Sequence, residues 1–113
     1  MVIQSLELRH FRNYTHFKTE FSPGINWIYG KNGQGKTNLA EAIYYICNLE
    51  SFRTRKNTHL LQKGNSQAVI QADLKRVDVL HLIRILVNSK GRQVLLDRSA
   101  YNKVSDYILS FLA

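Results

Sequence analysis

The sequence predicts an α/β fold in which a mixed sheet surrounds one central helix and continues into an antiparallel β meander. Three observations carry this prediction. Side chains alternate at period two near the N-terminus, apolar residues recur at period 3.6 over residues 36–49, and three strand-like segments with short connections follow. The chain has 113 residues and is 44% apolar, which suits one domain, or a piece of one, with a hydrophobic core.

The N-terminal elements are predicted as a strand at residues 2–9 and a second strand at residues 15–21, with an interruption at 10–14. Residues 22–24 read S-P-G and predict a turn, because Pro fixes one backbone angle and Gly allows a positive one. The apolar run at residues 25–29 is typical of a short strand that is buried on both faces.

A helix is predicted over residues 36–49, where apolar side chains recur at steps of three and four. Residues 50–66 are polar and basic and predict a loop with one helical turn. Three strands are expected at 67–75, 79–88 and 93–97, and their short connections favour an antiparallel meander. Helical spacing of apolar residues returns over 101–112, which predicts a second helix.

The charge of the chain indicates an anionic partner. Lys and Arg number 16 against 8 Asp and Glu, for a net charge of +8 at pH 7. Such an excess suits nucleic acid, a nucleotide or a membrane surface. The single cysteine cannot form a disulfide within the chain, no signal-peptide pattern is found, and the apolar runs are far shorter than the roughly 20 residues that cross a bilayer. We therefore expect a cytoplasmic chain with no membrane partner.

The segment that carries chemistry is residues 30–37, G-K-N-G-Q-G-K-T, which matches the P-loop pattern G-x-x-x-x-G-K-[ST] at every defined position. Glycines let successive backbone N–H groups point at a phosphate, and the following helix adds its positive end. Lys36 then contacts the β- and γ-phosphates of ATP, and the hydroxyl of Thr37 is a ligand for Mg²⁺. The predicted nucleotide-binding residues are Gly30, Lys31, Asn32, Gly33, Gln34, Gly35, Lys36 and Thr37.

This segment has two possible interpretations. A glycine-rich loop with a lysine for solubility needs no particular flanking structure. A P-loop needs a strand before it and a helix after it, and both are predicted here. The flanking pattern therefore favours a P-loop NTPase fold.

Five separated motifs narrow the class. They are L-R-H-F-R-N-Y at 8–14, S-P-G-I-N at 22–26, the P-loop at 30–37, E-A-I-Y at 41–44 and S-F-R-T at 51–54. Together they resemble ABC-type ATPases of the structural-maintenance-of-chromosomes (SMC) kind, and within these the RecF-like family of bacterial recombination mediators. The resemblance covers residues 2–64 strongly and is weaker but compatible beyond. It implies that residues 1–113 are the N-terminal portion of an ATPase head, with a P-loop subdomain at about 1–64 and the meander plus helix at about 65–113.

The rest of such a head is not found in the sequence. An L-S-x-G-x signature is absent, and Val94-Leu95-Leu96-Asp97 lacks the second acid of a Walker B strand. No catalytic residue is therefore assigned, no complete second lobe is expected, and we expect the 113-residue chain alone to be inactive as an ATPase.

The resemblance also implies roles for residues outside the P-loop. Arg12 and Asn13 of the F-R-N segment would lie beside the nucleotide phosphates; without the family, an Arg at a strand end on the surface is an equal reading. Arg53 would lie near the nucleotide or begin a DNA-facing loop, and the sequence does not choose between them. Candidate DNA contacts are Arg53, Arg55, Lys56 and Lys63, for which a solvated basic loop is the alternative.

The aromatic residues Tyr29, Tyr44, Tyr45 and Phe52 flank the P-loop helix. They suit either stacking on adenine or packing in the core, and helical spacing favours the core.

By the same resemblance, the parent protein would be a weak DNA-dependent ATPase that binds ATP and Mg²⁺ and forms an ATP-dependent homodimer. It would bind single-stranded and gapped double-stranded DNA and, with RecO and RecR, load recombinase during repair, replication and the SOS response to DNA damage. Two other classes remain open: a small-molecule P-loop kinase, and a non-enzymatic DNA-binding module with a vestigial P-loop.

Overall fold

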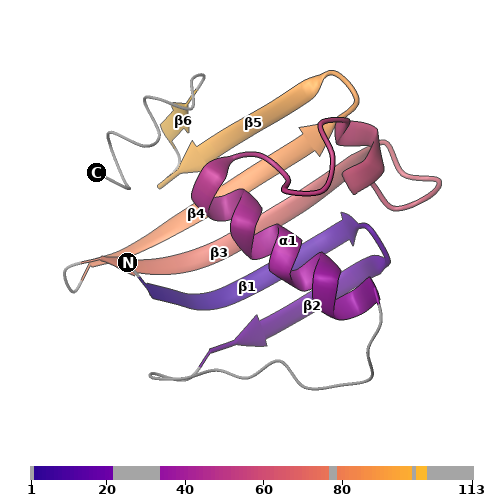
Figure 1. The fold of residues 1–113 in the computed structure, drawn as a ribbon. Helices are drawn as coiled ribbons and strands as arrows, with labels where there is room; N and C mark the ends of the chain where they lie inside the picture. Colours follow the sequence, from indigo (N-terminus) through magenta and orange to yellow (C-terminus); the bar gives the residue numbers. More distant parts are fainter. Residues whose placement is uncertain (1, 22–33, 77–78, 98, 102–113) are drawn as a thin grey trace.

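The computed structural model describes residues 2–21, 34–76, 79–97 and 99–101, and in them a helix crosses one face of a twisted sheet (Figure 1). The described sheet has the strand order β2-β1-β3-β4-β5-β6, and every one of its pairings is antiparallel. The elements are β1 (Val2–Phe11), β2 (Tyr14–Glu20), α1 (Gln34–Asn48), the 3-10 helix η1 (Asn57–Leu60), β3 (Gln67–Arg76), β4 (Val79–Asn88), β5 (Gly91–Leu96) and β6 (Ser99–Tyr101).

The first hairpin is tighter than the sequence predicts. Phe11 pairs with Tyr14, so Arg12 and Asn13 alone form the connection instead of residues 10–14. Phe11 stays in the strand because its side chain is fully buried in the core. Arg12 takes a positive φ of 52°, a left-handed conformation that is unfavourable for a residue with a side chain. The turn therefore holds Arg12 in a strained conformation.

The predicted meander is confirmed. Strands β3 and β4 pair without interruption from Gln67–Asn88 to Arg76–Val79, and β5 follows β4 through a short turn. The prediction of a helix from residue 101 is wrong at its first residue, because Tyr101 belongs to β6 and pairs with Val94. Residues 102–112 lie outside the described residues, as do the turn at 22–24 and the strand at 25–29.

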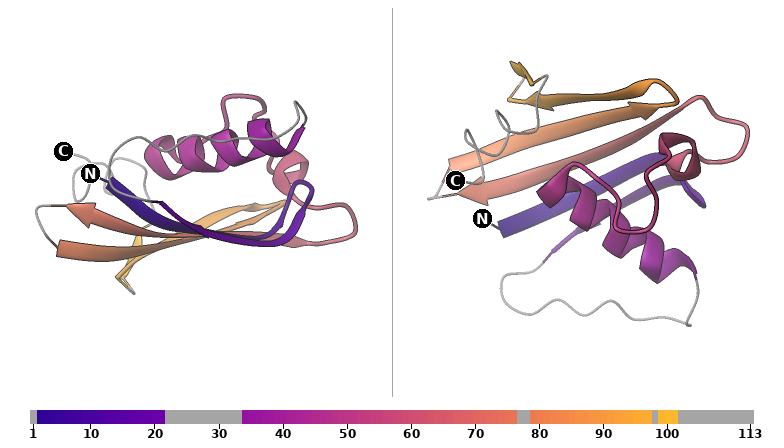
Figure 2. Two further views of the ribbon diagram at one scale, coloured as in Figure 1. Left: turned by 90° about the horizontal axis from the view of Figure 1, so that it is seen from below. Right: turned by 45° about the horizontal axis from the view of Figure 1, so that its top comes forward.

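The helix prediction is confirmed with a small shift, because α1 runs from Gln34 to Asn48. Figure 2 shows α1 lying on one side of the sheet, and the core fills the space between them. Fully buried leucines and isoleucines each stabilise the fold by about 1.5–3 kcal/mol relative to exposure. The buried apolar residues of α1 are Leu39, Ala42, Tyr45 and Ile46, and those of the facing strands include Leu6, Leu8, Ile70, Leu74, Ile83, Ile85 and Val87.

The loop between α1 and β3 contains the predicted helical turn, η1, and is tied to the first hairpin. The backbone N–H of Arg12 donates to the carbonyl of Leu60 at 2.9 Å, and the N–H of Gln62 donates to the carbonyl of His10 at 2.8 Å. Leu60 itself is 1% exposed. These contacts hold the loop against the end of β1. None of the helices among the described residues is long and apolar enough to cross a membrane.

Candidate nucleotide-binding site

The predicted P-loop leads directly into α1. Gly30 to Gly33 lie outside the described residues, and Gln34, Gly35 and Lys36 form the first turn of the helix. The first N–H groups of a helix have no partner within it, and the helix dipole makes this end attractive to anions. The first turn contains no acidic residue, and the side chain of Thr37 is exposed. The described part of the segment thus suits phosphate and a hydroxyl-bound cation.

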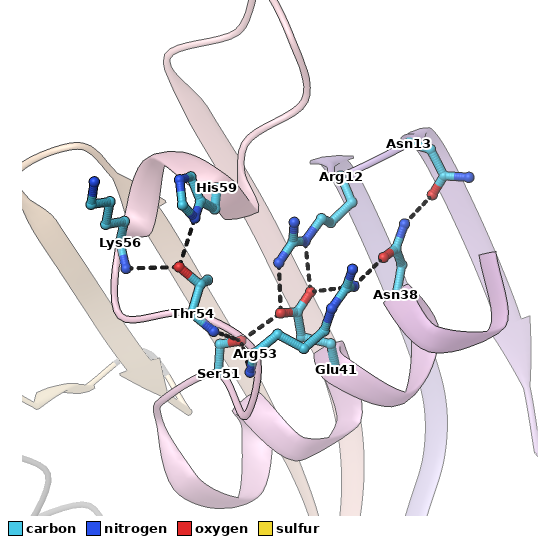
Figure 3. Close-up of polar contacts among 9 residues, drawn as sticks. All are labelled: Arg12, Asn13, Asn38, Glu41, Ser51, Arg53, Thr54, Lys56 and His59. Atoms are coloured by element: carbon cyan, nitrogen blue, oxygen red, sulfur yellow. Dashed lines mark hydrogen bonds and ion pairs between the residues drawn. The ribbon is translucent and has the colours of Figure 1, made fainter. Parts of the chain in front are cut away.

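One turn further along α1, the buried carboxylate of Glu41 contacts two arginine side chains. Glu41 is 0% exposed and accepts two hydrogen bonds from Arg12, from Nε to Oε1 at 2.8 Å and from Nη2 to Oε2 at 2.9 Å (Figure 3). This two-pronged arrangement matches the planar guanidinium to the carboxylate. Arg53 lies 3.6 Å away from the same carboxylate, and the hydroxyl of Ser51 donates to it at 2.5 Å.

A second polar chain starts from Asn38, which is 2% exposed. Its amide donates to Oδ1 of Asn13 at 2.7 Å, and its Oδ1 accepts from Nη1 of Arg53 at 2.6 Å. Figure 3 shows these side chains lined up from the first hairpin to the loop after α1. Asn38 and Glu41 together connect the Arg12–Asn13 turn with α1 and with residues 51–54, which follow α1 in the chain.

Ser51 also fixes the backbone of this loop. Its hydroxyl oxygen accepts from the N–H groups of Arg53 at 2.9 Å and Thr54 at 3.2 Å. Oγ1 of Thr54 accepts from the N–H of Lys56 at 3.1 Å and lies 2.7 Å from Nδ1 of His59. Arg53 is therefore held from both its backbone and its side chain.

The pKa of Glu41 is lowered from its ordinary value, although burial alone would raise it. The hydrogen bonds from Arg12 and Ser51, with the positive charges of Arg12 and Arg53, outweigh the loss of solvation. Glu41 is consequently a stable carboxylate at neutral pH, and its charge keeps the two arginines in place.

The structure brings together some of the residues that the sequence singles out. The side chains of Arg12, Asn13 and Arg53 meet at Asn38 and Glu41 of α1. These two helix residues follow Lys36 and Thr37 closely in the sequence. Their contact with a nucleotide stays a prediction. Arg55, Lys56 and Lys63 have exposed side chains and lie apart from this cluster, and their contact with DNA likewise stays a prediction.

Sequence reasoning missed Asn38, Glu41 and Ser51. A signal for the first two was present, because they are polar residues three positions apart, next to the apolar Leu39 and Ala42. Polar side chains at that spacing share a helix face and need partners when the face is buried. Their partners come from other segments, so nothing local in the sequence identifies them.

The aromatic residues near α1 differ in burial, which bears on whether they pack in the core or are free to stack on a base. Tyr45 is 1% exposed and belongs to the core, whereas Tyr44 and Phe52 are 37% and 50% exposed. The rings of Tyr44 and Phe52 meet edge to face, with centroids 5.2 Å apart and planes at 82°. Tyr29 lies outside the described residues.

The sequence of this chain is similar to those of known DNA repair proteins. Residues 2–109 match the model of the RecF/RecN/SMC N-terminal domain. The DNA replication and repair protein RecF of Chlamydia trachomatis serovar L2 is 40% identical over 108 residues, and that of Streptococcus uberis is 39% identical. Each alignment covers 96% of this chain, which spans only about 30% of the length of these curated relatives.

Two solved structures share the fold. The recombination mediator protein RecF-ATPrS in the RecFOR pathway aligns with a TM-score of 0.87 and 25% identity, over 95% of this chain and 29% of that one. RecF-ATP in the same pathway aligns with a TM-score of 0.85 and 26% identity, over 93% and 30%. With the family model matching nearly the whole sequence, the chain belongs to the RecF/RecN/SMC N-terminal domain family.

Proposed function

We propose that this chain is the nucleotide-binding N-terminal part of a RecF-type DNA replication and repair protein, and that residues 30–37 bind the phosphates of ATP. The observation that carries the proposal is the P-loop string running directly into α1, in a chain whose fold aligns with RecF-ATP at a TM-score of 0.85. A glycine-rich segment that ends in the free N–H groups of a helix is a favourable phosphate site.

Each residue has a proposed part in binding. Backbone N–H groups of residues 30–35 surround the phosphates, the ammonium of Lys36 contacts the β- and γ-phosphates, and the hydroxyl of Thr37 is a ligand for Mg²⁺. Arg12 and Asn13 approach the phosphates from the hairpin turn, where Glu41 and Asn38 hold their side chains. Mg²⁺ would supply charge neutralisation between the phosphate oxygens.

The proposal extends to the whole protein of which this chain is the N-terminal portion. That protein would form an ATP-dependent homodimer in the cytoplasm, bind single-stranded and gapped double-stranded DNA, and act with RecO and RecR to load recombinase. The names of the relatives and the RecFOR pathway of the two solved structures support this reading. Arg53, Arg55, Lys56 and Lys63 are the proposed DNA contacts within the chain.

The nucleotide site is tested by substituting Lys36. We expect Lys36→Ala to weaken binding of a fluorescent ATP analogue by at least about tenfold, because a charge-assisted contact to phosphate is lost. Lys90→Ala removes the same charge from the exposed turn between β4 and β5 and serves as the control. Equal affinity of the Lys36→Ala variant and the parent chain would show that residues 30–37 are not the nucleotide site.

The proposed ATP-dependent binding of DNA is tested on the full-length gene product with labelled gapped DNA. We expect ATP and Mg²⁺ to raise the affinity for DNA, and Lys36→Ala to remove that increase. Affinity that ignores the nucleotide would favour the non-enzymatic DNA-binding module. Transfer of the γ-phosphate to a small acceptor without DNA would favour the P-loop kinase.

A further inference from the structure

A second cavity lies at the opposite end of α1 from the P-loop. It has a volume of about 690 Å³ and lies between the last turn of α1, the loop that follows it and the start of β5. In Figure 1 this loop passes in front of the sheet on the same side as α1. Tyr45 is eleven residues from the start of α1, so the two sites are separated by roughly 16 Å along the helix axis. The volume is within the range of roughly 300–1,000 Å³ typical of small-molecule sites.

One wall of the cavity is aromatic. Tyr44 and Phe52 line it, and their side chains are 37% and 50% exposed. They meet edge to face, at an interplanar angle of 82°, so the edge of one ring lies on a face of the other and the remaining ring faces are not covered by this pair. Exposed aromatic faces beside a cavity are suitable platforms for a planar ligand.

The cavity lining is also cationic. Arg53, Arg55 and Arg92 line the cavity together with one carboxylate, Glu50. Arg53 is already engaged by Asn38 and Glu41, whereas Arg55 and Arg92 form no ion pair with an acidic side chain in the described part of the chain. Both are exposed, and Arg92 shares its strand face with the buried Val94, so it points to the α1 side of the sheet.

Tyr45 also lines the cavity, and its hydroxyl is buried near Arg92. Tyr45 is 1% exposed, and its hydroxyl makes no hydrogen bond to any described residue. Burial raises the pKa of this hydroxyl, and the nearby guanidinium of Arg92 partly offsets the rise. A buried hydroxyl without a partner is uncommon, because most buried polar atoms are satisfied.

We propose that this cavity binds one nucleotide unit of single-stranded DNA. The base stacks on Phe52 and Tyr44, and the phosphate contacts Arg55 and Arg92. The inference rests on the proposed DNA binding of this chain, and it adds a defined subsite at the other end of α1 from the P-loop, which shares Ser51 and Arg53 with the Glu41 cluster. Stacking on aromatic side chains combined with arginine contacts to phosphate is the usual way in which proteins bind single strands without sequence preference.

A single strand fits the cavity better than the two obvious alternatives. The bases of a duplex have their faces covered by neighbouring base pairs, so they are not available to Phe52. A free nucleoside triphosphate carries several charges on one end, whereas Arg55 and Arg92, which lack an ion-pair partner among the described residues, match a single phosphodiester when the charge of Glu50 is counted against them.

The test is the affinity of the 113-residue chain for a fluorescein-labelled dT12 oligonucleotide, measured by anisotropy. We expect Phe52→Leu and Arg92→Gln each to weaken binding by at least about fivefold, which is the lower range for loss of one stacked base. Arg84→Gln is the matched control. Arg84 is exposed on β4, on the face of the sheet opposite to the buried Ile83 and Ile85. We expect its affinity to stay within about twofold of the parent chain.

Cross-linking locates the base. An oligonucleotide carrying 5-iododeoxyuridine, irradiated with the chain, should cross-link to the peptide that contains Tyr44 or Phe52, as read by mass spectrometry. Displacement of dT12 by millimolar dTMP as effectively as by unlabelled dT12 would assign the cavity to a free nucleotide and overturn the proposal.

The outcomes also separate this proposal from the proposed function. If parent, Phe52→Leu and Arg92→Gln bind dT12 equally, the cavity assignment is wrong while DNA binding stands. If none of them binds dT12, the cavity proposal fails, and the test with gapped DNA and the full-length gene product decides the proposed function. ATP binding, measured independently with Lys36→Ala, remains a test of the P-loop in either case.

Discussion

At the scale of single residues, Glu41 is the centre of the candidate nucleotide site. Its carboxylate is fully buried and is balanced by the guanidinium of Arg12, with Arg53 at 3.6 Å. Removing one partner of a buried pair leaves the other charge without compensation. The left-handed backbone of Arg12 adds to this requirement, because a strained turn persists only where the surroundings hold it.

Glu41→Gln should therefore lower the free energy of unfolding by about 3 kcal/mol, within the range measured when one partner of a buried ion pair is removed. Urea denaturation at pH 7 measures the change. Glu7→Gln is the control, because Glu7 pairs with the exposed side chains of Arg9 and His16, and surface pairs contribute much less. A Glu41→Gln variant as stable as the Glu7→Gln variant would contradict the central role of Glu41.

The same carboxylate predicts a pH dependence. Because the folded pKa of Glu41 is lowered from 4.5, its charge stabilises the folded chain above that pH, and this contribution disappears as pH falls through the folded pKa. The stability difference between the parent chain and Glu41→Gln should be full at pH 7 and clearly smaller at pH 3. Urea titrations at both pH values measure it, and a difference that stays constant would mean that Glu41 is not ionised in the folded chain.

At the scale of elements, the loop between α1 and β3 joins the two sites. Its first part carries Ser51 and Arg53 into the Glu41 cluster and Phe52 into the second cavity. Its last part is anchored by Leu60, which is 1% exposed, and by the backbone bonds to His10 and Arg12. The position of the loop is thus set by one buried side chain and a few hydrogen bonds.

Leu60→Ala should lower the free energy of unfolding by about 2–5 kcal/mol, the usual range for a leucine removed from a core. Leu61→Ala provides the comparison, because Leu61 is only partly buried and its loss should be smaller. Thermal denaturation followed by circular dichroism measures both variants. Equal effects would indicate that η1 is held by its backbone bonds and not by the core.

At the scale of the whole molecule, the net charge of +8 is the property on which the proposed association with DNA depends. Phosphate contacts release counterions, so the logarithm of affinity for a single strand falls linearly with the logarithm of salt concentration, by about 0.7 for each phosphate neutralised. Loss of one phosphate contact should reduce the slope by about that amount.

Arg55→Gln should therefore reduce the salt slope of dT12 binding by about 0.7, while Phe52→Leu should weaken binding and leave the slope unchanged. Anisotropy titrations at several potassium chloride concentrations measure both. If Phe52→Leu alone altered the salt slope, the assignment of base stacking to Phe52 and of phosphate contact to Arg55 would be wrong.

The fold could be predicted from the sequence to a large extent. The helix, the first two strands and the meander were found because periods of 3.6 and 2 are local properties of the chain. The predicted end of the first strand at residue 9 is wrong, because β1 continues through His10 to Phe11, whose side chain is buried by the rest of the chain. The predicted helix start at Tyr101 is wrong for a similar reason, because Tyr101 pairs with Val94 on another strand.

The sequence by itself determined the class of this protein. A P-loop string, its flanking elements and the F-R-N and S-F-R-T motifs are contiguous patterns, and each residue in them can be recognised without a partner. Only the tertiary structure decided how Arg12, Asn13 and Arg53 are held, and that Phe52, Arg55 and Arg92 share one cavity. The reason is physical. A buried charge and a binding cavity depend on groups that chain folding brings together, and the spacing of these groups in the sequence does not predict how close they lie in the folded chain.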